Sequence, residues 1–534
     1  MALDNIYYWL ARGRINMIAT VLRSGLIILD TPQVPQAAKT ALNLSNARAN
    51  WTIDNVTSSA DLVTKYASAS ANTLFVLPQG NLSWGESALT PSGADNVGIV
   101  EHASGTTFNS LSGQRLFTFT GTHGRNNFLQ VTIANWGKSG TNRDVIRVES
   151  NGHSYDDPFR ITGGSFSDFG GGIEAIIAIA KGARNICVDR NNFSNTTRAA
   201  IRFDASASDV PQNLQDISNN NDWYFTDPID LDLSYDDATL GALGVDCCIC
   251  NNDFQSVVSA SGSAISTSPG DTFADGSVWL NTRIRIIQNY FKWNSNEIIQ
   301  IKSSNNTTLQ NIIEDSRTSI SIRNANFNKI CRTLSYGNSQ DGSWGAFGGS
   351  DNTIEDWYFI TNKDGDNRAG RHEVTRWGRR GNGTPLIPVF RNTIRRANLI
   401  NQVNNNSHVL GIGLRDENAS SGSYTNTDHE SSTVAIQRPI KDLTLEDVTV
   451  VAEAGNCVVY QPGNYDSFTF NSPNGPNTNI TCSGLKVRTN GTASAGVNVS
   501  LLQSDFETLT GAEPDYLADG LAMVGTFGYG KELL

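Results

Sequence analysis

The sequence predicts an all-β protein built as a parallel β-helix, a coil in which each short strand stacks on its counterpart one turn away. The composition is the first indication: 48 glycines in 534 residues and only 17% charged residues favour short strands and many turns over helical bundles. The second is a recurring segment, a polar residue (often Asn) followed by alternating apolar positions. It is found at 185–193, 214–219, 284–291, 306–313, 326–333, 352–359, 392–399, 443–450 and 479–487.

The spacing of these segments is the third indication. Their starts at 306, 326, 352 and 392 are 20, 26 and 40 residues apart, and we interpret the longest step as an inserted loop. Strand repeats of about 20–30 residues without helices indicate a solenoid. Asn suits both the left-handed corners and the side-chain ladders of such a coil. A leucine-rich horseshoe would need its leucine motif, and a β-sandwich, the main alternative, would not repeat so regularly.

Three regions are expected: an N-terminal module at 1–50, the β-helix at 51–500 and a C-terminal cap or tail at 501–534. The first carries apolar and aromatic residues at mixed three- and four-residue spacing, which is typical of a short helical or mixed module. It serves either to cap the coil or to attach the protein to something else. From 51 on, Ser58 and Asp61 resemble a capping box before a helical run at 62–67. A strand stopped by Pro78 and Gly80 follows, so we expect this helix to cover the first coil.

The net charge and the patterns typical of membrane spans and secretory signals indicate which partners and which location to expect. The net charge of −12 argues against a nucleic-acid partner, and no apolar run of about 20 residues predicts a membrane span. Asp4 comes early and no cleavage site follows, so a secretory signal is not expected. We therefore expect assembly in the cytosol of the maker, with the seven cysteines as buried free thiols. A metal fragment at Cys247, Cys248 and Cys250 is the less favoured alternative, because it lacks a fourth ligand.

The candidate catalytic residues are Lys302 and Arg323, which lie 21 positions apart, close to one turn of the predicted coil. Residues one turn apart stack at about 4.8 Å. The arginine would then lower the pKa of the Lys302 ammonium, which suits Lys302 to act as a general base. Glu297 lies five residues before Lys302 in the sequence.

Two loops hold further candidates. The inserted loop at 364–388 is basic in an acidic protein, and is interpreted either as a solvated loop or as a wall that binds anions through Arg forks and a stacking Trp. Its predicted substrate-binding residues are Arg371, Arg376, Trp377, Arg379 and Arg380, with Arg368 and His372 beside them. The acidic loop at 225–237 is more typical of a solvated loop than of paired hydrolytic carboxylates or a calcium site. It contains Asp227, Asp230, Asp232, Asp236 and Asp237.

The run Glu297-Ile298-Ile299, Lys302-Ser303-Ser304 and Asn306, with Arg323 one coil later, resembles polysaccharide lyase family six, which includes chondroitinase B and several alginate lyases. The resemblance implies a right-handed β-helix that cleaves acidic polysaccharide by β-elimination. It also implies that Lys302 removes the C5 proton of a uronate, Arg323 assists the departing C4 oxygen, and Glu297 is one ligand of a Ca²⁺ that neutralises the substrate carboxylate. The family holds that ion with an Asn and two Glu. Here Ser295 stands at the second Glu position, and 261–266 offers no clear Asn match.

These features together predict a phage tailspike-like protein of the virion that binds, and depolymerises, an acidic cell-surface polysaccharide. A flat β-helix face suits packing around a three-fold axis, so a homotrimer is expected, with residues 1–50 docked on each other or on a tail-adaptor protein. Two alternatives stay open. One is a non-enzymatic receptor-binding or structural fibre on the same scaffold, and the other is a free, extracellular bacterial lyase.

Overall fold

The computed structural model describes most of the chain from Trp51 onward, in segments. The predicted N-terminal module at 1–50 and the acidic loop at 225–237 lie outside the described residues. The described residues are 51–110, 115–121, 127–137, 144–150, 159–170, 173–180, 183–195, 199–204, 247–260, 263–267, 283–295, 297–303, 306–316, 319–323, 325–337, 346–347, 349–362, 372–375, 389–403, 408–412, 440–460, 479–493 and 506–525.

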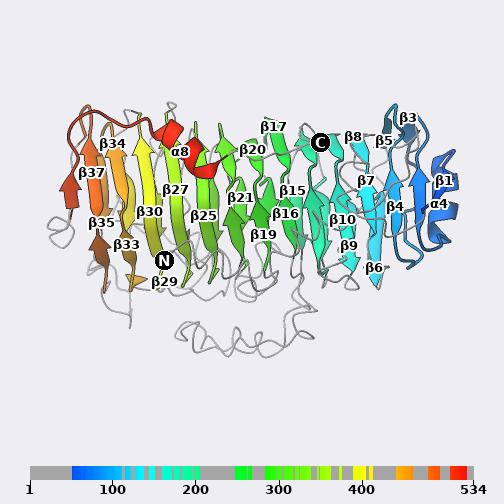
Figure 1. Ribbon diagram of the computed structural model, residues 1–534, viewed down its shortest axis with the longest axis horizontal. Coiled ribbons are helices and arrows are strands. Elements are labelled where there is room, and N and C mark those ends of the chain that lie inside the picture. The colour runs from blue at the N-terminus through cyan, green and yellow to red at the C-terminus, as the bar shows by residue number, and fades with distance from the viewer. Residues whose placement is uncertain are drawn as a thin grey trace, which may run out of the picture.

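The described strands form a parallel β-helix with three stacks of strands along its length (Figure 1). The first stack is β1 (Thr52–Asn55), β2 (Thr73–Val76), β4 (Val97–Val100), β7 (Phe128–Gln130), β10 (Phe159–Thr162), β13 (Ile186–Asp189), β16 (Cys248–Cys250), β19 (Arg285–Ile287), β22 (Thr307–Leu309), β25 (Lys329–Tyr336), β27 (Thr353–Thr361), β30 (Thr393–Asn401), β33 (Thr444–Glu446) and β36 (Thr481–Ser483).

The second stack shares β25, β27 and β30 with the first, because these long strands extend across both. The two stacks therefore form one 25-stranded sheet. The other members of the second stack are β3 (Gly80–Ser83), β5 (Thr106–Ser110), β8 (Thr132–Trp136), β11 (Ser165–Phe169), β14 (Asn192–Ser194), β17 (Asp253–Ala260), β20 (Tyr290–Ser295), β23 (Ile312–Glu314), β34 (Thr449–Ala452), β37 (Leu485–Thr489) and β38 (Phe506–Thr508).

The third stack is a separate 11-stranded sheet, and it carries the candidate catalytic residues. A short pair, β29 (Val389–Phe390) and β32 (Ile440–Lys441), lies outside the three stacks. The strands of the third stack are β6 (Phe117–Gly121), β9 (Asp144–Ser150), β12 (Ala175–Ala180), β15 (Ala199–Asp204), β18 (Ile265–Ser266), β21 (Ile299–Ile301), β24 (Ile320–Arg323), β26 (Ala346–Phe347), β28 (His372–Thr375), β31 (His408–Ile412) and β35 (Asn456–Tyr460).

The predicted fold class is confirmed. The expected strands at 306–313, 326–333, 352–359 and 392–399 overlap β22, β25, β27 and β30, which pair in that order and in parallel. The expected strand at 185–193 spans β13 and β14, with a corner at Arg190, whose φ is 55°. One expectation needs correction: the long step after 352 is more than a loop, because the four-residue strand β28 lies inside it. A strand that short shows too little alternation to be recognised from sequence.

The start of the coil is capped as the sequence predicts. Helix α4 (Ser59–Ala67) begins after Ser58, whose hydroxyl accepts a hydrogen bond from the Asp61 amide at 3.1 Å. The Asp61 carboxylate in turn accepts from the amide of Thr57 at 2.8 Å. Leu62 and Tyr66 of this helix are fully buried against the first coils, so the apolar end of the β-helix is covered.

Asparagines line the interior corners in ladders, as expected, but the ladder and the left-handed corner mostly use different residues. Asn252 donates to Asn289, and Asn289 donates to Asn311, through both the backbone amide and the side-chain amide, at 3.0–3.2 Å. The residue just before each ladder position has positive φ; Gln288 and Gln310 are examples. Ladder asparagines satisfy buried amides along the coil axis, which lets successive corners stack.

The core is filled by ladders of like side chains. Phe166, Phe193, Phe254 and Phe291 stack face to face, with ring centroids 4.7–4.9 Å apart. In the third stack an isoleucine ladder continues through β12, β15, β18, β21 and β24. Because side chains alternate across a strand, these inward ladders determine which residues lie on the outer face.

After β38 the chain forms a second helix, α8 (Tyr516–Val524), which packs on the outside of the 25-stranded sheet (Figure 1). It covers an apolar row that includes Leu334 and Ile360. Gly520 makes this close approach possible, since a Cβ there would lie 2.7 Å from Leu334 Cδ1. Arg332 and Gln310 donate to the last helical carbonyls. In the part of the chain that the structure describes, no helix is both long and apolar enough to span a membrane.

Candidate functional site

Lys302 lies just beyond the end of β21, on the third stack. Ile299 and Ile301 are fully buried in the core, so the alternate positions, Gln300 and then Lys302, fall on the outer face. Lys302 is half-buried there. The local sequence folds this way because apolar residues at every second position match the pleat of a strand that has one buried face.

The register of β21 and β24 brings Lys302 and Arg323 to the same level. Ile299 pairs with Ile320 and Ile301 with Ile322, an offset of 21 residues. One residue further, the same offset places the backbone of Arg323 beside that of Lys302 on the neighbouring strand. The Arg323 side chain lies outside the described part of the structure, so contact of the two side chains with one sugar ring stays a prediction.

Hydrogen bonds to neighbouring residues hold the backbone that carries Lys302. The Lys302 amide donates to the hydroxyl of buried Thr267, on the preceding coil, at 3.0 Å. On the other side, Asn306 donates through its side-chain amide to the carbonyl and the hydroxyl of Ser303, at 2.7 and 2.9 Å. Asn306 also donates to Asn328 of the next coil. The backbone is therefore held at Lys302 and at the residue that follows it, which limits the positions available to a reacting group on Lys302.

Thr267→Val should test this anchor, because valine has the shape of threonine without the acceptor. A poorly hydrated amide left without its partner costs about 1–3 kcal/mol, so the denaturation midpoint should fall, and any activity that depends on Lys302 should fall with it. Thr267→Ser keeps the hydroxyl and is the matched control. If both variants behave alike in denaturant titrations and in turnover, the hydroxyl does not hold Lys302.

Glu297, the predicted metal ligand, is buried, with 6% of its surface exposed, and accepts a hydrogen bond from the side chain of Gln300. Its surroundings do not fit calcium, which takes six to eight oxygen ligands, several of them carboxylates. Ile265 pairs with Ile299, so on the preceding coil Ser263 stands level with Glu297. Among the described residues Glu297 belongs to no group of three His, Cys, Asp or Glu side chains whose ligand atoms come together.

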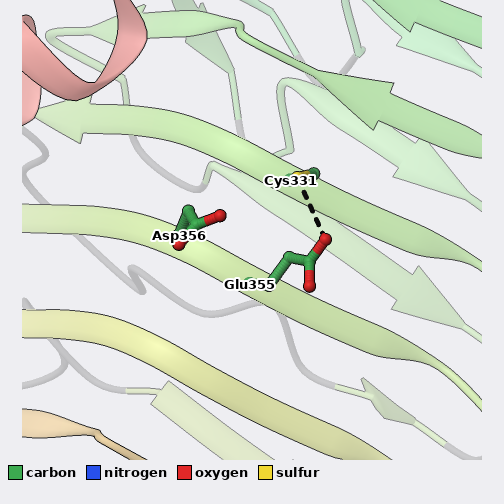
Figure 2. Close-up of side chains that lie close together, drawn as sticks. All are labelled: Cys331, Glu355 and Asp356. Carbon is green, nitrogen blue, oxygen red and sulfur yellow. Dashed lines mark hydrogen bonds between the residues drawn. The ribbon is translucent and has the colours of Figure 1, made fainter. Parts of the chain in front are cut away.

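One such group does exist in the described residues, on the first stack: Cys331, Glu355 and Asp356, whose ligand atoms lie within 4.8 Å of one another (Figure 2). Nearby cations already occupy its carboxylates. Lys329 and Arg395 form ion pairs with Glu355, and Arg396 pairs with Asp356 at 2.6 Å.

The electrostatics of Glu355 follow from this arrangement. Burial alone would raise its pKa, but the hydrogen bonds and charges of Lys329 and Arg395 lower it, to about 2. Burial, together with the charge of Glu355, raises the pKa of the Cys331 thiol, so the thiolate that a metal requires is disfavoured. These residues form an ion-pair network across neighbouring coils rather than a good cation site.

The cysteines support free thiols over a metal fragment. None of the seven forms a disulfide, and all but Cys482 are buried. Cys247 belongs to the interior core, whereas Cys248 and Cys250 pack with Cys187 in a separate cluster. Consecutive residues of a strand face opposite sides of the sheet, so Cys247 and Cys248 do not converge on one ion.

Most of the predicted anion-binding loop lies outside the described residues, including the side chains of Arg371, Arg376, Trp377, Arg379 and Arg380, and also Arg368. The backbone of β28, which begins at His372, is described. It belongs to the third stack, two strands beyond β24 in the order β21, β24, β26, β28. The described part of this region, β28, therefore belongs to the same sheet as β21 and β24.

The outer face of the third stack also holds ion pairs that sequence reasoning missed. Asp144 accepts from Arg115 and from Arg147, and Arg147 also pairs with Glu149. Asp144, Arg147 and Glu149 all lie on β9, whereas Arg115 lies one coil earlier, 29 residues before Asp144, and only spacing by one coil length could have linked it to the others. Because each of these carboxylates is paired, they repel a polyanion less than isolated carboxylates would.

Comparison with solved structures gives the same fold. A mannuronic acid specific polysaccharide family 6 lyase from human gut microbiota superposes with a TM-score of 0.50 at 11% identity, over 90% of this chain and 96% of that one. A PL6 alginate lyase in complex with a trisaccharide gives 0.53 at 14%, over 84% and 88%. Alginate lyase AlyF-OU02 in complex with G6 gives 0.51 at 12%, over 85% and 88%.

At these identities the likeness establishes the fold. No protein-family profile matches the chain, and no curated protein matches it. The chain is therefore a parallel β-helix of the kind found in polysaccharide family 6 lyases, with Lys302 and Arg323 at equivalent levels of adjacent strands on its third stack.

Proposed function

We propose that this protein is a lyase that binds an acidic, uronate-containing polysaccharide on the outer face of its third stack and cleaves it by β-elimination. One observation supports the proposal: the 21-residue offset of the β21–β24 register, extended by one residue past Ile301 and Ile322, puts the backbone of Arg323 level with that of Lys302. The fold is shared with alginate lyases, whose substrates are polyuronates, and this supports the substrate class.

The chemistry needs few groups. In its neutral form the Lys302 amine takes the proton from C5 of the uronate, next to the ring carboxylate. The electron pair of that C–H bond forms the C4–C5 double bond, and the C4–O bond breaks. Arg323 stays charged at all relevant pH values, so its role is to hydrogen-bond the departing oxygen, which takes its proton from solvent. A preorganised cation at the site of developing negative charge is the largest stabilisation available here.

The test is incubation of the purified protein with a panel of uronate polymers, including mannuronate- and guluronate-rich alginates. β-Elimination leaves a double bond conjugated with a carboxylate, so the product absorbs in the ultraviolet, and chain length falls in parallel. We expect both signals with at least one polyuronate and neither with a neutral glucan. Binding without either signal would favour the non-enzymatic receptor-binding alternative.

The tailspike, homotrimer and tail-adaptor expectations depend on residues 1–50, which lie outside the described residues, and they stay proposals. On the 25-stranded sheet, the apolar row under α8 is covered by the chain itself. A trimer would therefore use a different face. Light scattering at micromolar concentration measures the oligomeric state directly, and a monodisperse monomer would contradict the trimer.

A further inference from the structure

Glu297 is part of a hydrogen-bonded chain that joins two coils. Ser266 and Gln300 pair in register on β18 and β21. The Ser266 hydroxyl donates to Gln300 Oε1 at 3.2 Å, and Gln300 Nε2 donates to Glu297 Oε2. Ser266 and Glu297 are 8% and 6% exposed. The serine thus orients the amide, and the amide nitrogen faces the carboxylate.

The described residues near Glu297 offer poor ligands for a divalent cation. Ser263 is level with Glu297 on the preceding coil, and Ser295 precedes Glu297 by two residues. Serine hydroxyls are neutral, whereas calcium affinity rises with the number of charged ligands. One carboxylate, already accepting a hydrogen bond from Gln300, offers little to replace the hydration shell of the ion.

We propose that Glu297 is a positioning residue that orients Gln300, and that this protein binds its acidic polysaccharide without a divalent cation at Glu297. The polysaccharide half of the inference rests on the proposed function, whereas the role of Glu297 does not. Stabilisation of the substrate carboxylate then falls to hydrogen-bond donors of the third stack other than the base, the Gln300 side-chain amide among them. The negative charge of Glu297 opposes binding of a polyanion while its hydrogen bond supports the site.

Two substitutions separate these effects. Glu297→Gln keeps an acceptor for Gln300 and removes the charge, so a mannuronate or guluronate hexasaccharide should bind as tightly as to wild type or about two- to tenfold more tightly. Glu297→Ala removes the acceptor as well and should weaken binding relative to Glu297→Gln. Glu507→Gln, at an exposed position on β38, makes the same change in net charge and is the matched control.

Calcium titration by calorimetry provides a readout that needs no substrate. We expect no stoichiometric Ca²⁺ binding that depends on Glu297, and hexasaccharide dissociation constants that agree within about twofold in EDTA and in millimolar Ca²⁺. Stoichiometric binding of Ca²⁺ that disappears in Glu297→Gln, or saccharide binding that requires Ca²⁺, would overturn the inference.

The two proposals fail in different ways. If no hexasaccharide binds in either buffer, the proposed function and the polysaccharide half of the inference are wrong, and the calcium titration still decides whether Glu297 is a metal ligand. If Glu297→Ala and Glu297→Gln bind the saccharide equally, Glu297 does not orient Gln300.

Discussion

Lys302→Ala is expected to lower polyuronate cleavage by about two to four orders of magnitude, the range that a positioned general base contributes. Saccharide binding should remain measurable, because other groups of the third stack still contact the polymer. The effect should therefore appear mainly in kcat. The measurement is the rate of unsaturated-product formation, together with hexasaccharide affinity from calorimetry.

The matched control is Lys292→Ala. Lys292 lies on β20 in the second stack and is 45% exposed, paired with Glu314 and Asp315 on the surface. Losing such a pair costs little, so cleavage should be unchanged. If Lys302→Ala retains full activity, the base lies elsewhere, and the site assignment fails even if the protein is a lyase. If both variants lose activity, the loss reflects folding.

Asp189→Asn is expected to destabilise the protein by about 3–5 kcal/mol, the cost of breaking a buried ion pair by removing one partner. Asp189 and Arg160 face each other across β13 and β10, with Arg160 Nε 2.8 Å from Oδ1 and Nη2 2.6 Å from Oδ2. Their side chains are only 2% and 6% exposed. Arg190 adds a third charge, 3.4 Å from Asp189. The substitution leaves the Arg160 guanidinium buried without its counter-charge.

Acid should also destabilise the wild-type protein, because protonation of Asp189 removes the charge that pairs with Arg160. Burial would raise the pKa of Asp189, but Arg160 outweighs it and lowers the pKa below its ordinary value. A lowered pKa means that the contribution to stability is complete above the unfolded value of about 3.9 and is lost as the pH falls through the folded value. Asparagine does not titrate, so the part of the acid-induced loss of stability that comes from Asp189 should be absent in Asp189→Asn.

Denaturant titrations from neutral to acidic pH measure both effects. Lys292→Ala, which disrupts a surface pair, should cost less than about 1 kcal/mol and serves as the control. The double variant Arg160→Met with Asp189→Leu should recover most of the stability, because a buried pair can be replaced by apolar side chains at little cost. If the free energy of unfolding of Asp189→Asn lies within about 1 kcal/mol of the wild-type value, the prediction is wrong, and water has replaced Asp189 as the partner of the Arg160 guanidinium.

Prediction from the sequence succeeded where the information is local. The cap at Ser58 and the parallel stacking of the expected segments within the described residues are confirmed, whereas the expected strand at 214–219 lies outside those residues. Each of these depends on a few neighbouring residues: alternation, a capping side chain, or a corner that tolerates positive φ. The 21-residue separation of Lys302 and Arg323 equals the offset of the β21–β24 register, while the catalytic roles of the two residues stay predictions.

Contacts between coils of unequal length could not be predicted from the sequence. The step from β18 to β21 is 34 residues and that from β21 to β24 is 21, so no fixed period predicts that Ser266 reaches Gln300 or that Thr267 holds the Lys302 amide. The Arg160–Asp189 pair spans 29 residues for the same reason. The short strand β28 was taken for loop because four residues show too little alternation.

By itself, then, the sequence determined that this chain coils into stacked parallel strands and that a lysine and an arginine share one level of the coil. Alternation is a property of neighbouring residues, so it can be recognised whatever the length of the loops between the strands. Only the tertiary structure decided what surrounds Glu297. The loop lengths set which residue of one coil lies over which residue of the next. Among the described residues, they put Ser263 level with Glu297 and Ser266 against Gln300, which donates to the Glu297 carboxylate.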